Sequence, residues 1–167
     1  MILYKKLKPI ESTLEDEFLS EILSTKAAWF TAKNKDDGSL EFVLNKSNGQ
    51  FYMSRLTKFT NLLAKLKELY PDLNPVNSYV TKCFPGYHMV AHKDANRETA
   101  LIVPLGHNKG KLSYYVMGKK ILTHVYTGPV LSKVNWYHSA ENDSVDIRYS
   151  ITLEIPGSFL SNYFKYR

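Results

Sequence analysis

Apolar residues in two stretches of the first half recur at the spacing of an amphipathic helix. The stretches cover residues 11–24 and 56–70, and their apolar faces consist of Leu14, Phe18 and Ile22 in the first and Phe59, Leu62, Leu66 and Leu69 in the second. Ser12, followed three residues later by Glu15, predicts a capping box at the start of the first helix. Pro71 is expected to end the second helix, because proline cannot continue the hydrogen bonding.

Between these helices lie two segments with the alternation of β-strands. They are residues 27–33 (AAWFTAK) and 40–46 (LEFVLNK). The segment NKDDGS that joins them contains an Asp-Gly pair, which favours a tight turn. We therefore predict a β-hairpin here.

From residue 77 onward the pattern changes to short apolar or alternating segments separated by glycine, proline and asparagine. The predicted strands are residues 78–84, 87–94, 99–105, 111–117, 119–126, 129–138 and 147–155. Short strands at spacings of roughly 8–12 residues are typical of a β-sandwich or barrel, not of alternating βαβ units. We predict a mainly β protein with flanking helices (α+β), in which helices pack on one face of a double-sheet barrel of about seven or eight strands.

Length and composition favour a single domain. The chain has 167 residues, of which 44% are hydrophobic and 23% charged, as is usual for a globular protein. The two helices could bury their apolar faces only against the predicted sheets. We expect residues 1–167 to form one domain, with residues 1–75 as supporting helices and hairpin and residues 77–155 as the β core.

Cysteine content, hydropathy and charge indicate the cellular compartment and the kinds of partner that are expected. The lone cysteine, Cys83, cannot form an internal disulfide, which favours a reducing compartment such as the cytoplasm. No apolar run approaches the roughly 20 residues of a membrane span, so we expect no membrane association. The net charge of +6 comes mostly from scattered lysines, which usually form a solvated surface. It permits an acidic partner without requiring one.

Two histidines and an aspartate form a candidate metal site. His92 and Asp94 are two positions apart, so both side chains project from the same face of a strand, beside His88. His138, at the end of another predicted strand, would supply a third ligand. Two imidazoles and one carboxylate leave three positions of an octahedron open, which is the arrangement of non-haem Fe(II) oxygenases. Taken singly, these residues also fit a hydrogen-bonded pair at a strand end and a histidine in a turn.

The last predicted strand has two different faces. Apolar residues occupy one face (Ile147, Tyr149, Ile151, Leu153 and Ile155), and polar residues occupy the other (Arg148, Ser150 and Thr152). The turn-rich residues 139–146 predict antiparallel pairing with the strand that ends at His138, which would bring the polar face close to that histidine. Arg148 and Ser150 would form a carboxylate receptor, because a guanidinium grips a carboxylate with two donors and a hydroxyl adds a third. The alternative is an edge strand whose polar face lies in solvent.

Residues 77–155 resemble the catalytic core of the 2-oxoglutarate- and Fe(II)-dependent oxygenases. The matching pieces are HKD at 92–94, His138 44 residues further on, and RYS at 148–150. They occur in this order on predicted strands, and the match covers about half of the chain. The flanking FPGYHMVAH and GPVLSKVNWYHSAEN also have the character that the family shows around its metal ligands.

The resemblance implies a fold, two cofactors and a reaction. The fold would be a double-stranded β-helix (a cupin-like jelly roll) that holds Fe(II) between its sheets through His92, Asp94 and His138. The far carboxylate of 2-oxoglutarate would pair with Arg148 and Ser150, and ascorbate would serve as an additional reductant. Such a dioxygenase hydroxylates a C–H bond while 2-oxoglutarate is converted to succinate and carbon dioxide.

The substrate expected from the resemblance is a protein or peptide side chain. Small members of the family with the HxD form often resemble prolyl and asparaginyl hydroxylases, so prolyl, asparaginyl and aspartyl side chains are the leading expectation. Arg97, Tyr87 and Asn142 are the expected substrate contacts, although Arg97 also fits a surface salt bridge and Asn142 also fits a residue that holds a turn. A nucleic-acid substrate, motivated by the positive charge and twelve tyrosines, a small-molecule substrate, and a non-catalytic jelly-roll binding module remain alternatives.

Overall fold

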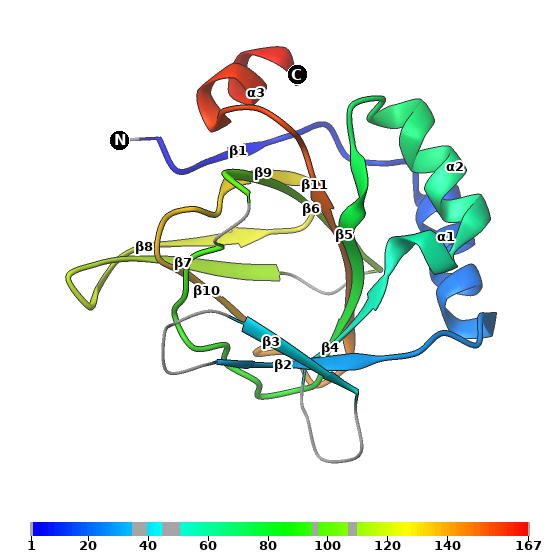
Figure 1. The fold of residues 1–167 in the computed structure, drawn as a ribbon, viewed down its shortest axis with the longest axis horizontal. Helices are drawn as coiled ribbons and strands as arrows, with labels where there is room; N and C mark the ends of the chain where they lie inside the picture. The colour runs from blue at the N-terminus through cyan, green and yellow to red at the C-terminus, as the bar shows by residue number, and fades with distance from the viewer. Residues whose placement is uncertain (1, 35–39, 45–50, 95–96, 107–109, 167) are drawn as a thin grey trace.

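The structure is a computed structural model that describes residues 2–34, 40–44, 51–94, 97–106 and 110–166. Its elements follow one another along the chain as shown in Figure 1. They are β1 (Tyr4–Lys6), α1 (Ser12–Ser24), β2 (Phe30–Asn34), β3 (Leu40–Leu44), β4 (Phe51–Arg55), the 3-10 helix η1 (Leu56–Lys58), α2 (Thr60–Leu69), β5 (Asn74–Cys83), β6 (Thr99–Leu105), β7 (Gly110–Val116), β8 (Lys119–Tyr126), β9 (Val130–Lys133), β10 (His138–Glu141), β11 (Arg148–Glu154) and α3 (Phe159–Lys165).

The strands form two antiparallel sheets. The large sheet has eight strands in the order β1-β9-β6-β11-β5-β4-β2-β3, and the small sheet has the order β10-β7-β8. The sheets face each other, because side chains from both meet in one apolar cluster that contains Leu3, Ile102, Leu112, Tyr114, Tyr126 and Val130. This confirms the predicted jelly-roll architecture.

The three helices cover the opposite face of the large sheet (Figure 1). The apolar face of β11 contributes to this second core together with β6, and the helices supply Phe18, Ile22, Leu62, Leu66 and Phe159. The predicted packing of helices on one face is therefore confirmed. Leu69 was expected on the buried face of α2 but is 45% exposed, because it lies in the last turn of that helix. None of the described helices is long and apolar enough to cross a membrane.

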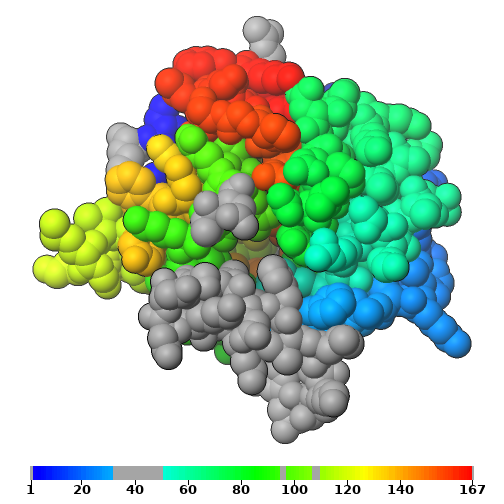
Figure 2. Space-filling view, in the orientation of Figure 1, coloured from blue at the N-terminus to red at the C-terminus, as the bar shows by residue number. Residues whose placement is uncertain are grey.

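Helix α3 closes the fold and was not predicted. Figure 2 shows it lying against the segment that follows α2. Asp72 in that segment pairs with Lys165 and accepts a hydrogen bond from the hydroxyl of Tyr166 at 3.1 Å. The signal for a helix was weak because the segment has only seven residues. Ser158 caps it by accepting a hydrogen bond from the Ser161 amide.

The first half of the chain contains the predicted helices and hairpin, with corrections at both helix starts and two strands, β1 and β4, that were not predicted. The helix predicted over residues 56–70 is divided into the 3-10 helix η1 and α2. Strands β2 and β3 pair antiparallel as expected for the hairpin, while the predicted Asp-Gly turn lies outside the described residues. The capping box at Ser12 is wrong, because the N-cap of α1 is Glu11, whose side chain makes no capping hydrogen bond. The helix begins one residue earlier than expected, so Ser12 already lies inside the first turn. Strand β4, unpredicted, joins the large sheet beside β5.

Three strand predictions in the second half are corrected. Residues 87–94 form no regular strand and make only isolated bridges, at His88 and at His92. The segment 129–138 divides into β9 and the start of β10, which belong to different sheets. Strand β10 pairs with β7 and not with β11. Both edges of β11 are already occupied by β5 and β6, so residues 142–147 cross from one sheet to the other.

A carboxylate from α1 caps the start of α2. The side chain of Glu21 accepts hydrogen bonds from the amides of Asn61 (3.1 Å) and Leu62 (2.8 Å). These amides have no partner within their own helix, and the negative charge interacts favourably with the helix dipole. Replacing Glu21 with alanine should therefore lower the free energy of unfolding by about 1 kcal/mol. The measurement is urea denaturation.

Glu17→Ala is the matched control, because Glu17 is on the same helix but exposed. It should leave the unfolding free energy within about 0.5 kcal/mol of the unmodified protein. Equal stability of the two variants would contradict the capping role of Glu21.

Candidate metal centre and active-site cavity

A cavity of about 260 Å³ lies between the two sheets. Its floor is the polar face of β11, where Arg148, Ser150 and Thr152 all line the cavity as the alternation predicted. Strand β11 lies inside the large sheet, and both Arg148 and Ser150 are buried. The alternative of a solvent-exposed edge strand is therefore wrong. The first half of the chain also contributes, through Phe51 and Met53 of β4.

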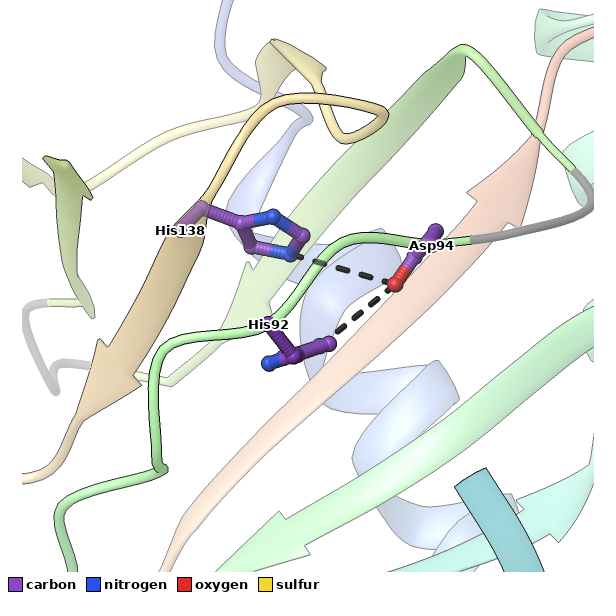
Figure 3. Close-up of side chains that lie close together, drawn as sticks. All are labelled: His92, Asp94 and His138. Atoms are coloured by element: carbon purple, nitrogen blue, oxygen red, sulfur yellow. Dashed lines mark ion pairs between the residues drawn. The ribbon is translucent and has the colours of Figure 1, made fainter. Parts of the chain in front are cut away.

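His92, Asp94 and His138 point toward one another in this cavity (Figure 3). The Oδ1 atom of Asp94 lies 3.4 Å from Nε2 of His92 and 4.0 Å from Nε2 of His138. One ligand atom from each residue lies within 4.8 Å of the other two. All three side chains are at most 10% exposed. The three groups are thus close enough to bind one metal ion.

Backbone carbonyls fix the orientation of both imidazoles. Nδ1 of His92 lies 3.0 Å from the carbonyl oxygen of Val90, and Nδ1 of His138 lies 2.9 Å from that of Trp136. A carbonyl oxygen can only accept, so each Nδ1 must carry the hydrogen. In the neutral ring the lone pair then sits on Nε2, the atom directed at Asp94. This is the tautomer that a metal ligand requires.

Arg97 holds the second oxygen of the aspartate. Its Nε donates to Oδ2 of Asp94 at 2.6 Å, and its Nη1 donates to the carbonyl of Asn77 at 3.3 Å. Oδ1 remains directed toward the two histidines. Arg97 therefore orients the carboxylate so that one oxygen is available to a cation.

Burial and neighbouring charges determine the protonation states of His92, Asp94 and His138. Burial lowers the pKa of His138 to about 4, so this ring is neutral at pH 7. Burial also acts to lower the pKa of His92, but the hydrogen bond and charge of Asp94 outweigh it and raise that pKa. Burial opposes ionisation of Asp94, yet the charge of Arg97 and the hydrogen bond from His92 lower its pKa well below the usual range. A bound cation would take the place of the proton on His92.

Arg148 is buried in the same cavity with an unused donor. Its Nη1 donates to the carbonyl of Glu141 at 2.5 Å, and the side chain is almost fully buried. Its Nε has no hydrogen-bond partner among the described residues. A buried guanidinium without an acidic partner is costly, so the site is suited to an anionic ligand.

Hydroxyl groups flank this guanidinium. The Oγ atom of Ser150 lies 2.7 Å from Oγ1 of Thr81, and either can donate. The Thr81 hydroxyl also lies 3.1 Å from the carbonyl oxygen of Ser150 and can donate to it. The proton of Ser150 is available to a ligand only when Thr81 donates to Oγ of Ser150 instead. Tyr126 also lines the cavity, and burial raises its pKa although the charge of Arg148 opposes this. Gly110 leaves room for its ring, because a Cβ there would lie 2.1 Å from it.

Sequence reasoning missed Thr81 and Tyr126. The alternation in KKILTHVY places His124 and Tyr126 on the buried side of β8, which was a usable signal. With twelve tyrosines in the chain, composition alone could not select this one.

The expected substrate contacts divide into two groups. Arg97 and Tyr87 both line the cavity, and the salt bridge of Arg97 is made to Asp94 and not at the surface. The structure does not bring Asn142 into the cavity. Its side-chain amide donates to the carbonyls of Cys83 and Asp146 and accepts from Ser144, so it holds the crossing between the sheets.

His88 does not share the face of the metal-ligand pair, which corrects the sequence prediction. The segment is irregular, so strict alternation is lost and the side chain is exposed. It lies 3.7 Å from a carboxylate oxygen of Glu141 and 3.4 Å from one of Asp143. Lys111 and Lys120 already pair with Glu141, so ammonium groups neutralise that carboxylate.

Comparison with known proteins bears on the fold. The sequence matches no protein-family model and no curated protein. An oxidoreductase of the 2OG-Fe(II) oxygenase family from Burkholderia pseudomallei superposes with a TM-score of 0.56 at 9% identity, over 87% of this chain and 78% of that chain. The ribosomal oxygenase YcfD from Escherichia coli gives a TM-score of 0.51 at 13% identity, over 90% of this chain and 45% of that chain. The chain has the fold of 2OG-Fe(II) oxygenases.

A further YcfD structure, in complex with cobalt and succinic acid, gives a TM-score of 0.50 at 14% identity over the same shares of the two chains. The chain thus spans less than half the length of YcfD and about four fifths of the Burkholderia protein. The likeness confirms the fold expected from HKD, His138 and RYS.

The pKa of His138 predicts a pH dependence of stability in the metal-free protein. Between pH 4.5 and 6.5 the unfolded chain binds a proton at this residue and the folded chain does not, so lowering the pH favours unfolding. The unfolding free energy should therefore fall as the pH is lowered through this window. His124, whose pKa burial also lowers, adds to the same slope. Urea denaturation at several pH values measures it.

Two variants isolate the contribution of His138. In His138→Gln the slope of the unfolding free energy against pH should decrease by the contribution of about one proton. In His88→Gln, at an exposed position, the slope should be unchanged. The raised pKa of His92 acts only above pH 6.5, where it makes stability fall as the pH rises. An unchanged slope in His138→Gln would show that the imidazole is not buried in its neutral form.

Proposed function

We propose that the protein is an Fe(II)- and 2-oxoglutarate-dependent dioxygenase that hydroxylates a C–H bond in a protein or peptide side chain. The observation that carries this proposal is the sharing of one cavity by two buried groups. One is the cluster of His92, Asp94 and His138, and the other is the guanidinium of Arg148 with its unpartnered Nε. A metal site alone would fit many functions, whereas a metal site facing a buried anion receptor fits a metal-chelating dicarboxylate.

The donor set suits iron. Two imidazole nitrogens and one carboxylate oxygen match non-haem Fe(II), and the described residues around the cluster supply no thiolate that would favour zinc. The carbonyls of Val90 and Trp136 hold both rings in the required tautomer, and Arg97 holds the carboxylate. We assign His92, Asp94 and His138 as the iron ligands.

The second cofactor would be held by β11 and its neighbours. Arg148 would bind the far carboxylate of 2-oxoglutarate through its guanidinium, and the hydroxyl of Ser150 would add a further donor when Thr81 donates to it. Burial strengthens both interactions, because few water molecules compete for them.

Iron at this site would supply the oxygen activation that couples decarboxylation of 2-oxoglutarate to hydroxylation of the substrate. The chain's own residues orient the metal ligands and the cosubstrate and exclude water from the site. The two sheets shield the cluster from bulk water, and His138 stays neutral at pH 7 because it is buried. Arg97 and Arg148 fix the two carboxylates on which the geometry of the centre depends.

Two observations support a protein or peptide substrate. The structurally similar YcfD is described as a ribosomal oxygenase. The cavity rim carries partly exposed apolar side chains, including Phe51, Tyr87 and Val90, which could contact a peptide. Prolyl, asparaginyl and aspartyl residues are the side chains that we propose as targets.

The role of Arg148 is testable by substitution. Arg148→Ala should weaken 2-oxoglutarate binding by about 30-fold or more, since a buried carboxylate would lose its charged partner at a cost of roughly 2–5 kcal/mol. Metal binding should be largely kept. Two calorimetric titrations in the absence of oxygen measure the affinities. Metal is titrated into the metal-free protein, and 2-oxoglutarate is then titrated into the metal-loaded protein.

Arg55→Ala provides the control, because Arg55 is exposed on β4 and should leave both affinities unchanged. Circular dichroism establishes that each variant is folded, and Arg148→Lys should recover part of the affinity by restoring the charge. Unchanged 2-oxoglutarate affinity in folded Arg148→Ala would refute the assigned role.

Succinate release tests the proposed reaction. The protein with Fe(II), 2-oxoglutarate and oxygen should release succinate slowly by itself, and faster with peptides that contain the target residue. Stimulation by oligonucleotides instead of peptides would show that the substrate is a nucleic acid. A complete lack of succinate under all conditions would identify a non-catalytic binding module.

A further inference from the structure

We propose that the cavity selects a neutral or acidic target side chain, excludes lysine and arginine, and uses Arg97 as the residue that determines this preference. The inference rests on the proposed function and deepens it, since it names the class of side chain that can reach the metal. It follows from the charges that line the cavity.

The described cavity lining contains one carboxylate and two guanidinium groups. The carboxylate belongs to Asp94, which is committed to the metal and to Arg97, and the guanidinium groups belong to Arg97 and Arg148. A divalent metal and a dianionic cosubstrate balance each other. Asp94 then balances one of the two guanidinium groups, so the occupied cavity keeps a positive charge. A cationic side chain entering it would find no acidic partner among the described lining residues.

The two arginines act at different places. Arg97 donates to the carbonyl of Asn77, just before the part of β5 that pairs with Thr152. Arg148 lies four residues away from Thr152 on β11, a distance of roughly 13 Å along a strand. Arg148 therefore serves the cosubstrate, while Arg97 places its charge directly beside the metal ligand Asp94. A substrate atom close enough to react must approach that charge.

Two carboxylates at the end of β10, the buried Glu141 and the more exposed Asp143, do not compensate. Glu141 is held by Lys111 and Lys120, and Asp143 is held by Lys111. Neither residue lines the cavity. Their charges are thus already balanced outside the path that a target side chain would take.

The other side chains that line the cavity are suited to contact the uncharged, aliphatic part of a substrate side chain. Phe51 stacks on Tyr87 with ring centroids 5.7 Å apart, and Met53 and Met89 lie in the same cavity wall. Val90 is 66% exposed at the rim. These side chains can cover the aliphatic part of a substrate residue by apolar contact. They would contact lysine and an uncharged residue of the same length equally well, so the charge distinguishes the two.

Binding of capped amino acids tests the proposal without requiring turnover. The full-length protein is loaded with Co(II) and 2-oxoglutarate, and changes in the visible absorption of cobalt are followed during titration. The probes are the N-acetyl amides of aspartate, asparagine, norleucine, lysine and arginine. Norleucine matches lysine in its stem but lacks the charge. Aspartate, asparagine and norleucine should bind at least tenfold more tightly than lysine and arginine.

Arg97→Gln separates the charge of this residue from its hydrogen bond. Glutamine can still donate to Asp94 but carries no charge, so the tenfold preference for norleucine over lysine should fall to within about twofold. Arg55→Gln, at an exposed position on β4, should keep the preference of the unmodified protein. This readout distinguishes a specificity role from loss of structure, which would weaken all five probes equally.

Three results would overturn the proposal. They are equal or tighter binding of the cationic probes, a preference that survives unchanged in Arg97→Gln, and a lack of binding by every probe. The spectral change on adding 2-oxoglutarate, before any probe, reports on the proposed cofactor site itself. If that change is absent, the proposed function fails and this inference fails with it, whereas a normal change followed by a preference for lysine overturns the inference alone.

Discussion

The candidate site depends on one pair of backbone hydrogen bonds. The amide of His92 donates to the carbonyl of His138 at 2.9 Å, and the amide of His138 donates to the carbonyl of His92 at the same distance. A third bond, from the amide of Asp94 to the carbonyl of Val134, extends this contact. These bonds join an irregular segment to the start of β10 and bring three ligand side chains from distant parts of the chain into one cluster. On its other edge β10 pairs with β7, which ties one side of this contact into the small sheet.

Charge balance explains why this arrangement tolerates burial. An isolated buried carboxylate would be costly, but Asp94 has a guanidinium on one oxygen and an imidazole near the other. Arg148 is different, because the described residues leave its charge without an acidic partner. At one end of the cavity the carboxylate of Asp94 is thus balanced by charges of the protein itself, whereas the guanidinium of Arg148 at the other end is suited to an anion. This asymmetry supports the proposed function, which combines a metal with a dicarboxylate.

The local pattern of apolar and polar residues predicted the helices and strands of this fold better than it predicted which strands pair. Alternation in residues 147–155 identified both faces of β11. His92 and Asp94 do point to the same cluster, but the segment that carries them is not the regular strand from which this direction was predicted. The partner of β10 was wrong, because strand pairing depends on contacts between distant residues and residues 142–147 cross between sheets. Phe51 entered the cavity unpredicted for the same reason. Arg97 was named, but its bond to Asp94 required three-dimensional information, and the assignment of site residues stays a prediction.

The most direct test is a spectroscopic titration in the absence of oxygen. Fe(II) is added to the metal-free protein, and 2-oxoglutarate is added next. The account predicts a visible charge-transfer band that requires both additions and is missing in His138→Ala. A folded protein that gives no band with both cofactors, or an undiminished band in His138→Ala, would contradict the claim that this cluster holds iron next to a bound dicarboxylate.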